Sequence, residues 1–176
     1  MARRGIVTAG TWCADHNKVV PYWPGEDRVT EVLSHEVRSG GSAANLAIDI
    51  KRLDPSVPVA TIGLLGDDGD GAILFGEAEA AGLDTSRLIR QKGARTNATD
   101  AFLSVESGRR THLSHFAVAR ELSPDHIDFD GIEARFAHIG LPGIHEKLDN
   151  PWGADANGWV TVLKKAKAAG LTTNLE

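Results

Sequence analysis

Apolar and polar residues recur along the first half of the chain in periods that alternate between strand and helix. Residues 5–10 form an apolar run with the length of one buried strand. In residues 43–53 the apolar side chains recur at helical spacing, and charged side chains occupy the opposite side. Residues 57–65 are again apolar, and a second helix is expected over residues 71–81, ended by Gly82. The pattern predicts the order strand, helix, strand, helix.

Two segments interrupt this order and predict a separate, smaller β-structure. Residues 16–37 combine clusters of β-forming residues with two prolines and a glycine, which suggests a hairpin or an excursion from the main sheet. Residues 99–106 and 111–116 are strand-like runs on either side of Ser107-Gly108, which predicts a second hairpin.

The C-terminal part returns to alternating elements. Ser123 and Pro124 are a helix-start signal, with serine as the N-cap and proline in the first turn. A strand is expected at residues 136–140, a helix at 159–169 and a further strand at 171–175. Strands that alternate with helices predict an α/β fold with a parallel sheet and right-handed crossovers.

The composition is that of a soluble globular protein, and it narrows the range of partners. The chain has 176 residues, enough for one domain core, with 41% hydrophobic and 24% charged residues. Its net charge is -5 and its basic residues are scattered, so no nucleic-acid partner is expected. Cys13 is the only cysteine, which excludes an internal disulfide and indicates a reducing compartment. Arg3 and Arg4 precede an apolar run of only strand length, so we expect neither signal peptide nor membrane span, and a cytoplasmic protein.

The strongest chemical signal is a paired-glycine turn that opens directly into the first predicted helix. Gly40 and Gly41 allow positive φ angles and let a ligand approach main-chain N–H groups closely. The helix N-terminus adds unpaired N–H donors, and Asn45 offers a carbonyl acceptor and amide donors. Such a combination suits a polyhydroxylated small molecule.

Several motifs together resemble one family. The strand at 5–10 leads to Asp15, residues 40–45 read Gly-Gly-Ser-Ala-Ala-Asn, and residues 63–68 read Gly-Leu-Leu-Gly-Asp-Asp. Residues 108–111, Gly-Arg-Arg-Thr, fall where a hairpin turn precedes another strand. From about residue 5 to the last residue, this arrangement resembles the pfkB (ribokinase-like) family of carbohydrate kinases.

The resemblance implies a fold and a domain organisation. The expected fold is a three-layer αβα ribokinase-like, Rossmann-like parallel sheet with a small β-lid. Residues 1–176 would form the N-terminal part of one such domain, with lid segments at about 16–37 and 99–116. Exposed lid edges invite pairing, so a homodimer through the lid is expected.

The resemblance also implies a carbohydrate kinase that transfers the γ-phosphoryl group of ATP to a sugar hydroxyl. The family's second motif, Gly-Ala-Gly-Asp, carries the catalytic aspartate, and it has no match in this sequence. We therefore expect no catalytic residue in this chain, with the catalytic aspartate and most of the ATP and Mg²⁺ sites downstream of Glu176. The chain would supply the sugar-binding half and would be inactive alone.

The substrate-binding residues that the resemblance implies are Asp15, Gly40, Gly41, Ser42 and Asn45. A carboxylate at Asp15 could accept two hydrogen bonds from sugar hydroxyls. Ser42 departs from ribokinases proper, which often carry lysine there. Ribose itself is thereby placed in doubt, and hexoses, keto-sugars and sugar acids stay open.

Two other kinds of site are tested by spacing and rejected. The acidic run at residues 67–71 suggests a calcium loop, but Ala72 and Ile73 stand where an oxygen ligand and a glycine are required. His112 and His115 would lie on opposite faces of a strand, which disfavours a shared metal ion. No metal site is expected. The alternative functions are a non-catalytic sugar-binding or dimerisation fragment, and a nucleoside kinase of the same fold.

Overall fold

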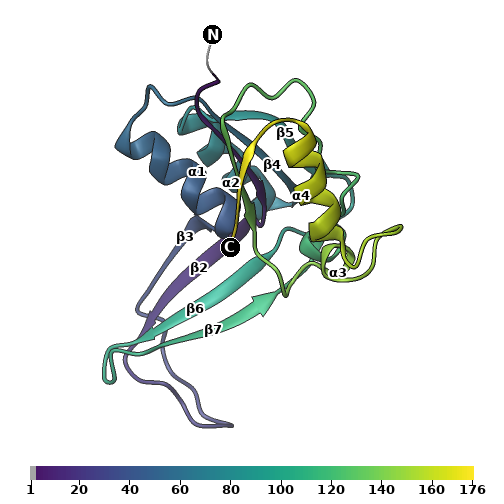
Figure 1. The fold of residues 1–176 in the computed structure, drawn as a ribbon. Helices are drawn as coiled ribbons and strands as arrows, with labels where there is room; N and C mark the ends of the chain where they lie inside the picture. Colours follow the sequence, from purple (N-terminus) through teal and green to yellow (C-terminus); the bar gives the residue numbers. More distant parts are fainter. Residues whose placement is uncertain (1–2) are drawn as a thin grey trace.

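A computed structural model describes residues 3–176 of the chain (Figure 1). The larger of its two sheets has five strands in the order β5-β4-β1-β8-β9, and every neighbouring pair is parallel. The strands are β1 (Ile6–Gly10), β4 (Val59–Gly66), β5 (Asp84–Gln91), β8 (Phe136–Gly140) and β9 (Thr172–Leu175). The predicted parallel sheet is confirmed.

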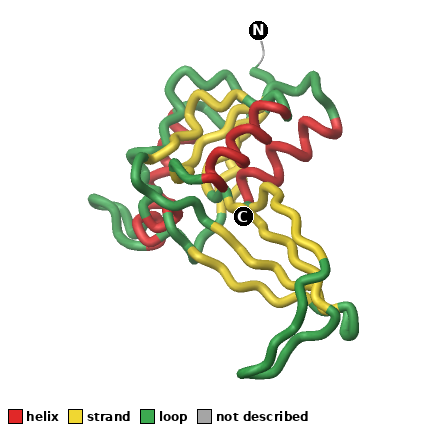
Figure 2. The backbone as a smooth tube through the Cα atoms, turned by 180° about the vertical axis from the view of Figure 1, so that it is seen from behind, coloured by secondary structure: helices red, strands yellow, loops and turns green. Residues whose placement is uncertain are grey.

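Helices cover both faces of this sheet. Helices α1 (Ser42–Leu53) and α2 (Gly69–Ala80) lie on one face, and α4 (Gly158–Ala168) lies on the other (Figures 1 and 2). A strand between two layers must bury both sets of alternating side chains. Strand β4 does so, because Ile62 and Leu64 pack in the α4 core while Leu65 packs in the α1–α2 core. The predicted three-layer αβα architecture is confirmed.

A second, four-stranded sheet projects from this body (Figures 1 and 2). Its order is β3 (Ser34–Gly40), β2 (Cys13–Val20), β6 (Ala98–Ser104) and β7 (Arg110–His115). Strands β2 and β6 are parallel, whereas β2–β3 and β6–β7 are antiparallel. The predicted hairpin is therefore confirmed as β6–β7. We call this sheet the projecting sheet.

The helix predicted to start at Ser123 and Pro124 is wrong. Residues 124–126 form a turn, in which the Ser123 N–H donates to His126 Nδ1 at 3.1 Å. The next apolar side chains, Ile127 and Phe129, are both buried in the α4 core. Two buried side chains two residues apart fit an extended segment and not a helix face, so tertiary packing overrides the local signal.

Three further features depart from the sequence expectations. Strand β5 was not expected, and among its side chains only Leu88 is buried, because β5 is an edge strand. The short helices η1 (Val118–Arg120) and α3 (Glu146–Asp149) were not expected either. Helix α2 starts earlier than predicted because Asp68 caps it, accepting a hydrogen bond from the Gly71 N–H at 2.9 Å. Within residues 3–176, no helix is both long and apolar enough to cross a bilayer.

Candidate functional site

The candidate site lies where the projecting sheet leaves the body. There β1 ends at Gly10, β2 begins at Cys13 and α1 begins at Ser42. In open parallel sheets, ligands bind outside the carboxyl ends of the strands. The sites proposed from the sequence therefore fall at the edge of the sheet where such a ligand is expected.

Asp15 and Gly40 are in direct contact. Asp15 lies in β2, two residue pairs away from the Cys13–Gly40 pair that joins β2 to β3. A Cβ atom placed on Gly40 would lie 2.1 Å from Asp15 Oδ2, so only glycine leaves room for this carboxylate. The carboxylate of Asp15 thus rests on the backbone of the glycine turn.

The surroundings of Asp15 shift the pKa of its carboxyl group. Burial raises the pKa of Asp15 above its ordinary value, and a hydrogen bond from Cys13 together with the charges of His112 and His16 opposes that rise. Burial also raises the pKa of the Cys13 thiol to about 12, so this thiol stays protonated. Cys13 is therefore a hydrogen-bond donor here and not a nucleophile.

Two hydroxyl groups extend this polar face and were missed by the sequence reasoning. Thr99 of β6 is the register partner of Asp15, and its Oγ1 lies 3.0 Å from Ser114 Oγ on β7. Thr99 Oγ1 also lies 3.4 Å from Cys13 Sγ. The only available signal was the alternation of side chains, which does not tell which strands become neighbours.

Gly41 and Thr11 fix the first turn of α1. Gly41 is the N-cap residue with φ 96°, and a Cβ atom there would lie 2.5 Å from the Thr11 carbonyl oxygen. The same oxygen accepts a hydrogen bond from the Ala43 N–H at 3.2 Å. Both the backbone angle and the close contact require glycine at this position.

Ser42 is buried, and its hydroxyl is engaged by neighbouring side chains. Ser42 Oγ donates to Glu176 Oε2 at 2.6 Å and lies 3.0 Å from His138 Nε2. His138 lies in the middle of β8, and Glu176 directly follows β9. The structure therefore joins Ser42 to a group of residues that the sequence did not single out.

Asn45 lies one turn further along α1 with an exposed side chain. It lines a hollow of about 270 Å³ together with side chains of β3, α1 and α2, namely Arg38, Ser39, Ile48, Asp49, Arg52 and Glu77. Asp15 does not line this hollow. The structure thus places Asp15 against Gly40, whereas the Ser42 hydroxyl contacts His138 and Glu176 and the Asn45 side chain lines a hollow without Asp15.

A larger hollow, of about 550 Å³, lies on the opposite face of the projecting sheet. Its lining includes His16 and Lys18, which alternate with Asp15 along β2. His16 Nε2 lies 3.1 Å from Asp70 Oδ2 of α2, and Lys18 Nζ donates to Asp100 Oδ1 at 2.6 Å. The His16–Asp70 pair connects the projecting sheet to α2 of the body, and the Lys18–Asp100 pair joins β2 to β6 within the sheet.

The acidic corner after β4 is structural. Asp68 Oδ1 accepts hydrogen bonds from Gly71 N–H and from Thr96 Oγ1, and Asp68 Oδ2 accepts one from the Thr96 N–H. Burial opposes ionisation of Asp68, but the hydrogen bonds from Thr96 and Gly71 outweigh it and lower its pKa. Asp68 therefore ties the start of α2 to the segment before β6.

The donor set does not fit a magnesium ion. Among residues 3–176, no three histidine, cysteine, aspartate or glutamate side chains are placed to hold a metal ion together. The Asp15 face offers one carboxylate and the hydroxyl groups of Thr99 and Ser114, which suit hydrogen bonding to a polyol. We assign no residue here to Mg²⁺ or to ATP.

Comparison with known proteins gives concordant findings. A sequence profile described as pfkB family carbohydrate kinase matches residues 4–140. The ATP-dependent ribose-1-phosphate kinase of Halopiger xanaduensis is 29% identical over 171 residues, which are 97% of this chain and 53% of that protein.

Solved structures agree on the fold. The ribokinase of Arabidopsis thaliana complexed with ribose and ATP matches with a TM-score of 0.74 and 19% identity, over 99% of this chain and 53% of that one. The nucleoside kinase of Methanocaldococcus jannaschii matches with a TM-score of 0.72 and 17% identity, over 99% and 53%. The predicted ribokinase-like fold is confirmed. The chain spans about half the length of the relatives that it matches.

Proposed function

This chain belongs to the pfkB family of carbohydrate kinases, and from that premise we propose that it serves the transfer of a phosphoryl group from ATP to a sugar hydroxyl. The residues described here would hold the sugar. ATP would supply the transferred phosphoryl group, and the catalytic aspartate is expected outside this sequence. The single cysteine, Cys13, suits the reducing cytoplasm in which we expect the enzyme to act.

One observation carries the proposal: the Asp15 carboxylate rests on the Gly40–Gly41 turn at the start of α1. A carboxylate accepts hydrogen bonds from two adjacent hydroxyl groups, and the two glycines place no side chain beside this carboxylate. Thr99 and Ser114 add hydroxyl groups on the same face. Phosphoryl transfer depends mainly on positioning and electrostatic stabilisation, and these groups would supply the positioning.

The projecting sheet would act as a lid over the bound sugar. It carries Asp15 and Thr99 on β2 and β6, so a sugar held by these residues lies against the sheet. A covering sheet excludes water, which otherwise competes with the sugar hydroxyl for the phosphoryl group.

The relatives suggest candidate phosphoryl acceptors for this chain but do not identify one. The relative from Halopiger xanaduensis is named for ribose 1-phosphate, so sugar phosphates join free sugars as candidates. A nucleoside kinase of the same fold matches nearly as well as the ribokinase, so nucleosides are the second candidate. A non-catalytic sugar-binding fragment would bind the sugar without turnover.

The test replaces Asp15 by asparagine. Sugar binding to residues 1–176 is measured by titration calorimetry, and ATP consumption is measured on the product of the entire reading frame. Because a hydrogen bond to a charged group contributes about 1.5–3 kcal/mol, D15N should weaken sugar binding by about 10- to 100-fold. The fold should persist in D15N, since the substitution removes a carboxylate whose burial is unfavourable.

The matched control is Asp100→Asn, because Asp100 lies on the same sheet but pairs with Lys18 on the opposite face. Sugar affinity should be unchanged in this control. Unchanged sugar affinity in a folded D15N protein would exclude Asp15 from the site. Turnover of nucleosides and not of sugars would refute the sugar as acceptor and identify a nucleoside kinase instead.

A further inference from the structure

The edge strand β7 places three polar side chains on the same face as Asp15. Thr99 of β6 pairs with Asp15 on one side and with Ser114 of β7 on the other, so these residues stand in one line across the projecting sheet. Side chains alternate along a strand, so Arg110 and His112 lie on the face of Ser114. This row follows β7 from the tip of the projecting sheet toward the body (Figure 1).

The side chains of Arg110 and His112 are exposed and have no partner in the part of the chain that the structure describes. Among residues 3–176, neither forms a hydrogen bond or an ion pair. The basic side chains of β2 and β3, by contrast, are all engaged: His16 with Asp70 and His35, Lys18 with Asp100, and Arg38 with Glu36. The donors of Arg110 and His112 therefore remain available to a ligand.

His112 is close enough to Asp15 to interact with it, yet the two side chains do not touch. Burial raises the pKa of Asp15, and the charge of His112 opposes that rise, which is the effect of a nearby cation. No hydrogen bond joins the two side chains, because two strand spacings, about 10 Å, separate β2 from β7. Between them lie the short side chains of Thr99 and Ala101 of β6. A ligand that reaches from Asp15 to His112 therefore lies across β6.

The two ends of this line carry opposite charges. The Asp15 carboxylate accepts hydrogen bonds from hydroxyl groups and repels an anion. Arg110 and His112 attract an anion, and the planar guanidinium of an arginine binds two phosphate oxygens at once. Arg110 stands about 7 Å from His112 along the strand, within the reach of an arginine side chain. A sugar that carries a phosphate group satisfies both ends, with its hydroxyl groups at Asp15 and its phosphate at β7.

Protection of the sheet edge explains these charges less well. Charged side chains on an edge strand discourage pairing with other chains, whichever face they occupy. Arg110 and His112 both lie on the Asp15 face. On the other face β7 carries Thr111 and Leu113, and a basic side chain only at its last residue. A ligand held between the carboxylate and the two cations requires this one-sided arrangement.

We propose that the acceptor is a sugar phosphate, that Asp15 holds its hydroxyl groups, and that Arg110 and His112 bind its phosphate group. This inference rests on the proposed function, and it chooses between the free sugars and the sugar phosphates that the proposed function leaves open. Ser114 and Thr99 add hydroxyl groups between the two ends. The phosphate points toward the tip of the projecting sheet, away from the glycine turn that Asp15 contacts.

The experiment measures binding to residues 1–176 by titration calorimetry. The ligands are D-ribose, D-fructose and their phosphate monoesters, with D-glucuronate as an anionic sugar that lacks phosphate. The measured quantity is the affinity of each sugar phosphate relative to its parent sugar. For at least one sugar phosphate this ratio should be at least about 10, the scale of one hydrogen bond to a charged group.

Two substitutions test the residues. R110Q should lower the affinity ratio by about 10-fold and H112Q should lower it several-fold, because each removes a donor to the phosphate. R110K keeps the charge but not the planar pair of donors, so it should restore part of the ratio.

Each substitution has a matched control. Arg109→Gln removes the same charge one residue before β7, and His115→Gln removes an imidazole from the opposite face of β7. Both controls should keep the affinity ratio of the unmodified chain. Thermal unfolding of each variant shows whether the fold is intact, which is expected because all the substituted residues are exposed.

The outcomes separate this inference from the proposed function. Sugar phosphates that bind no more tightly than their parent sugars would overturn the inference and leave the proposed function standing. An unchanged ratio in R110Q and H112Q, or an equal loss of ratio in Arg109→Gln, would do the same. A preference for D-glucuronate over every sugar phosphate would exclude the phosphate. Absence of binding by any sugar or sugar phosphate would overturn the proposed function and this inference together.

Discussion

At the scale of single residues, Gly40 and Gly41 lack side chains for different physical reasons. At Gly40 the obstacle is the Asp15 carboxylate, whose Oδ2 would lie 2.1 Å from an added Cβ. At Gly41 the obstacle is the backbone itself, since φ is 96° and the Thr11 carbonyl oxygen would lie 2.5 Å from the Cβ. The first constraint concerns the site, and the second concerns the start of α1.

Gly41→Ala should destabilise the fold because it places an L side chain at a positive φ and against a backbone oxygen. Such strained positions cost about 1–3 kcal/mol, which urea unfolding resolves. The control is Gly76→Ala in α2, where no atom lies within 4 Å of an added Cβ. That change should be neutral or stabilise the protein by about 0.5–1 kcal/mol. Equal stability of the two variants would contradict this account.

At the scale of elements, His145 joins parts of the structure that are distant in the sequence. His145 is buried, its Nδ1–H donates to the Ala119 carbonyl oxygen at 2.8 Å, and its Nε2 accepts from Thr11 Oγ1 at 2.7 Å. Its ring also packs edge-on against Trp159 of α4. One neutral imidazole, at the start of α3, thus contacts the segment after β1, η1 and α4.

The stability of the protein should fall as the pH drops below about 6.5, the ordinary pKa of histidine. Burial lowers the pKa of His145 in the folded state, against the opposing effects of its Ala119 hydrogen bond and the Asp149 charge. Below that pH the unfolded chain binds the proton more readily than the folded one, so the free energy of unfolding rises with pH. The contribution is complete above about 6.5 and is lost progressively below it.

Urea unfolding at pH 5.5 and 7.5 measures this dependence. His145→Gln should be less stable at both pH values, because the buried contacts of His145 are lost, but should show a smaller difference between them. His126, whose pKa burial also lowers, contributes in the same direction, so some difference remains. His115→Gln, an exposed control, should keep the full difference. A His145→Gln protein with the unmodified pH dependence would disprove the role of His145.

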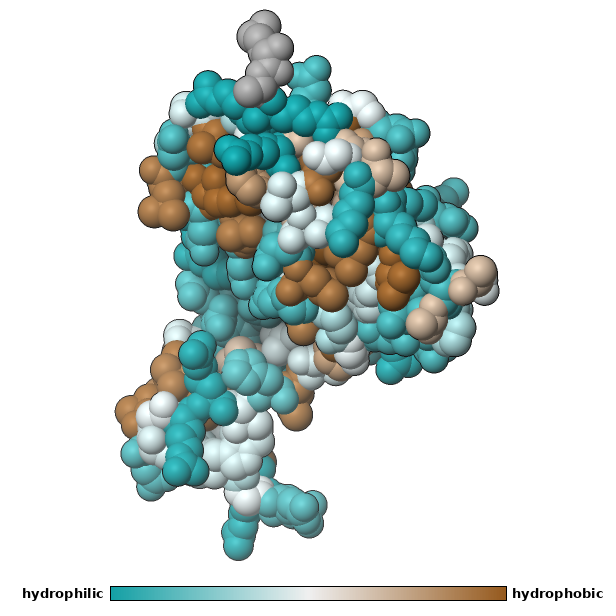
Figure 3. Space-filling view, in the orientation of Figure 1, coloured by the Kyte–Doolittle hydropathy of each residue, from teal (hydrophilic) through white to brown (hydrophobic). Residues whose placement is uncertain are grey.

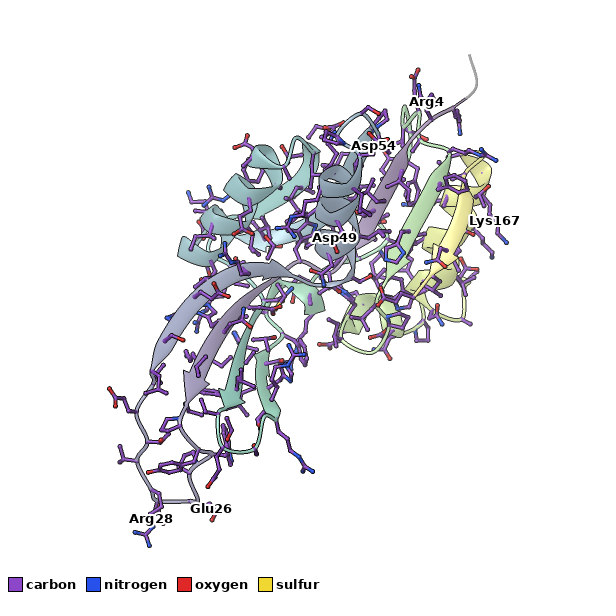
Figure 4. All side chains as sticks on the ribbon, turned by 90° about the vertical axis from the view of Figure 1, so that its left-hand side faces the viewer. Arg4, Glu26, Arg28, Asp49, Asp54 and Lys167 are labelled. Carbon is purple, nitrogen blue, oxygen red and sulfur yellow. The ribbon has the colours of Figure 1, made fainter. Side chains whose placement is uncertain are left out.

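At the scale of the whole molecule, the projecting sheet exposes apolar side chains on the face opposite Asp15. Leu113, the register partner of Asp100, is 58% exposed, and Trp23 is 48% exposed while its ring contacts Phe102 edge-on. Figure 3 shows apolar surface on this part of the molecule, and Figure 4 shows Glu26 and Arg28 only at the tip of its loop. We propose that a second copy of the chain covers this face.

Leu113→Glu should convert a dimer into a monomer in sedimentation velocity experiments, because it replaces an exposed apolar side chain of the proposed interface by a charge next to Asp100. The control is Leu53→Glu, since Leu53 is 86% exposed but lies at the end of α1 on the body. Sedimentation of the Leu53→Glu protein should match that of the unmodified chain. A monomeric unmodified chain would refute the proposed dimer.

The sequence by itself determined the elements and the local chemistry of the turn. Helical spacing, strand-length apolar runs and the Gly40–Gly41 pair depend on residues within a few positions of each other, so α1, β4, α4 and the parallel sheet could be predicted. The same local signals failed at Ser123, because burial of Ile127 and Phe129 stabilises an extended segment there.

Only the tertiary structure decided which side chains meet. Thr99 lies beside Asp15 because β2 and β6 pair in parallel, and Ser42 meets His138 and Glu176 because α1 begins where β8 and β9 end. Strand order and register arise from the packing of the whole core, and no short stretch of sequence encodes them. The turn could therefore be predicted from the sequence, whereas the contacts of Ser42 with His138 and Glu176 could not.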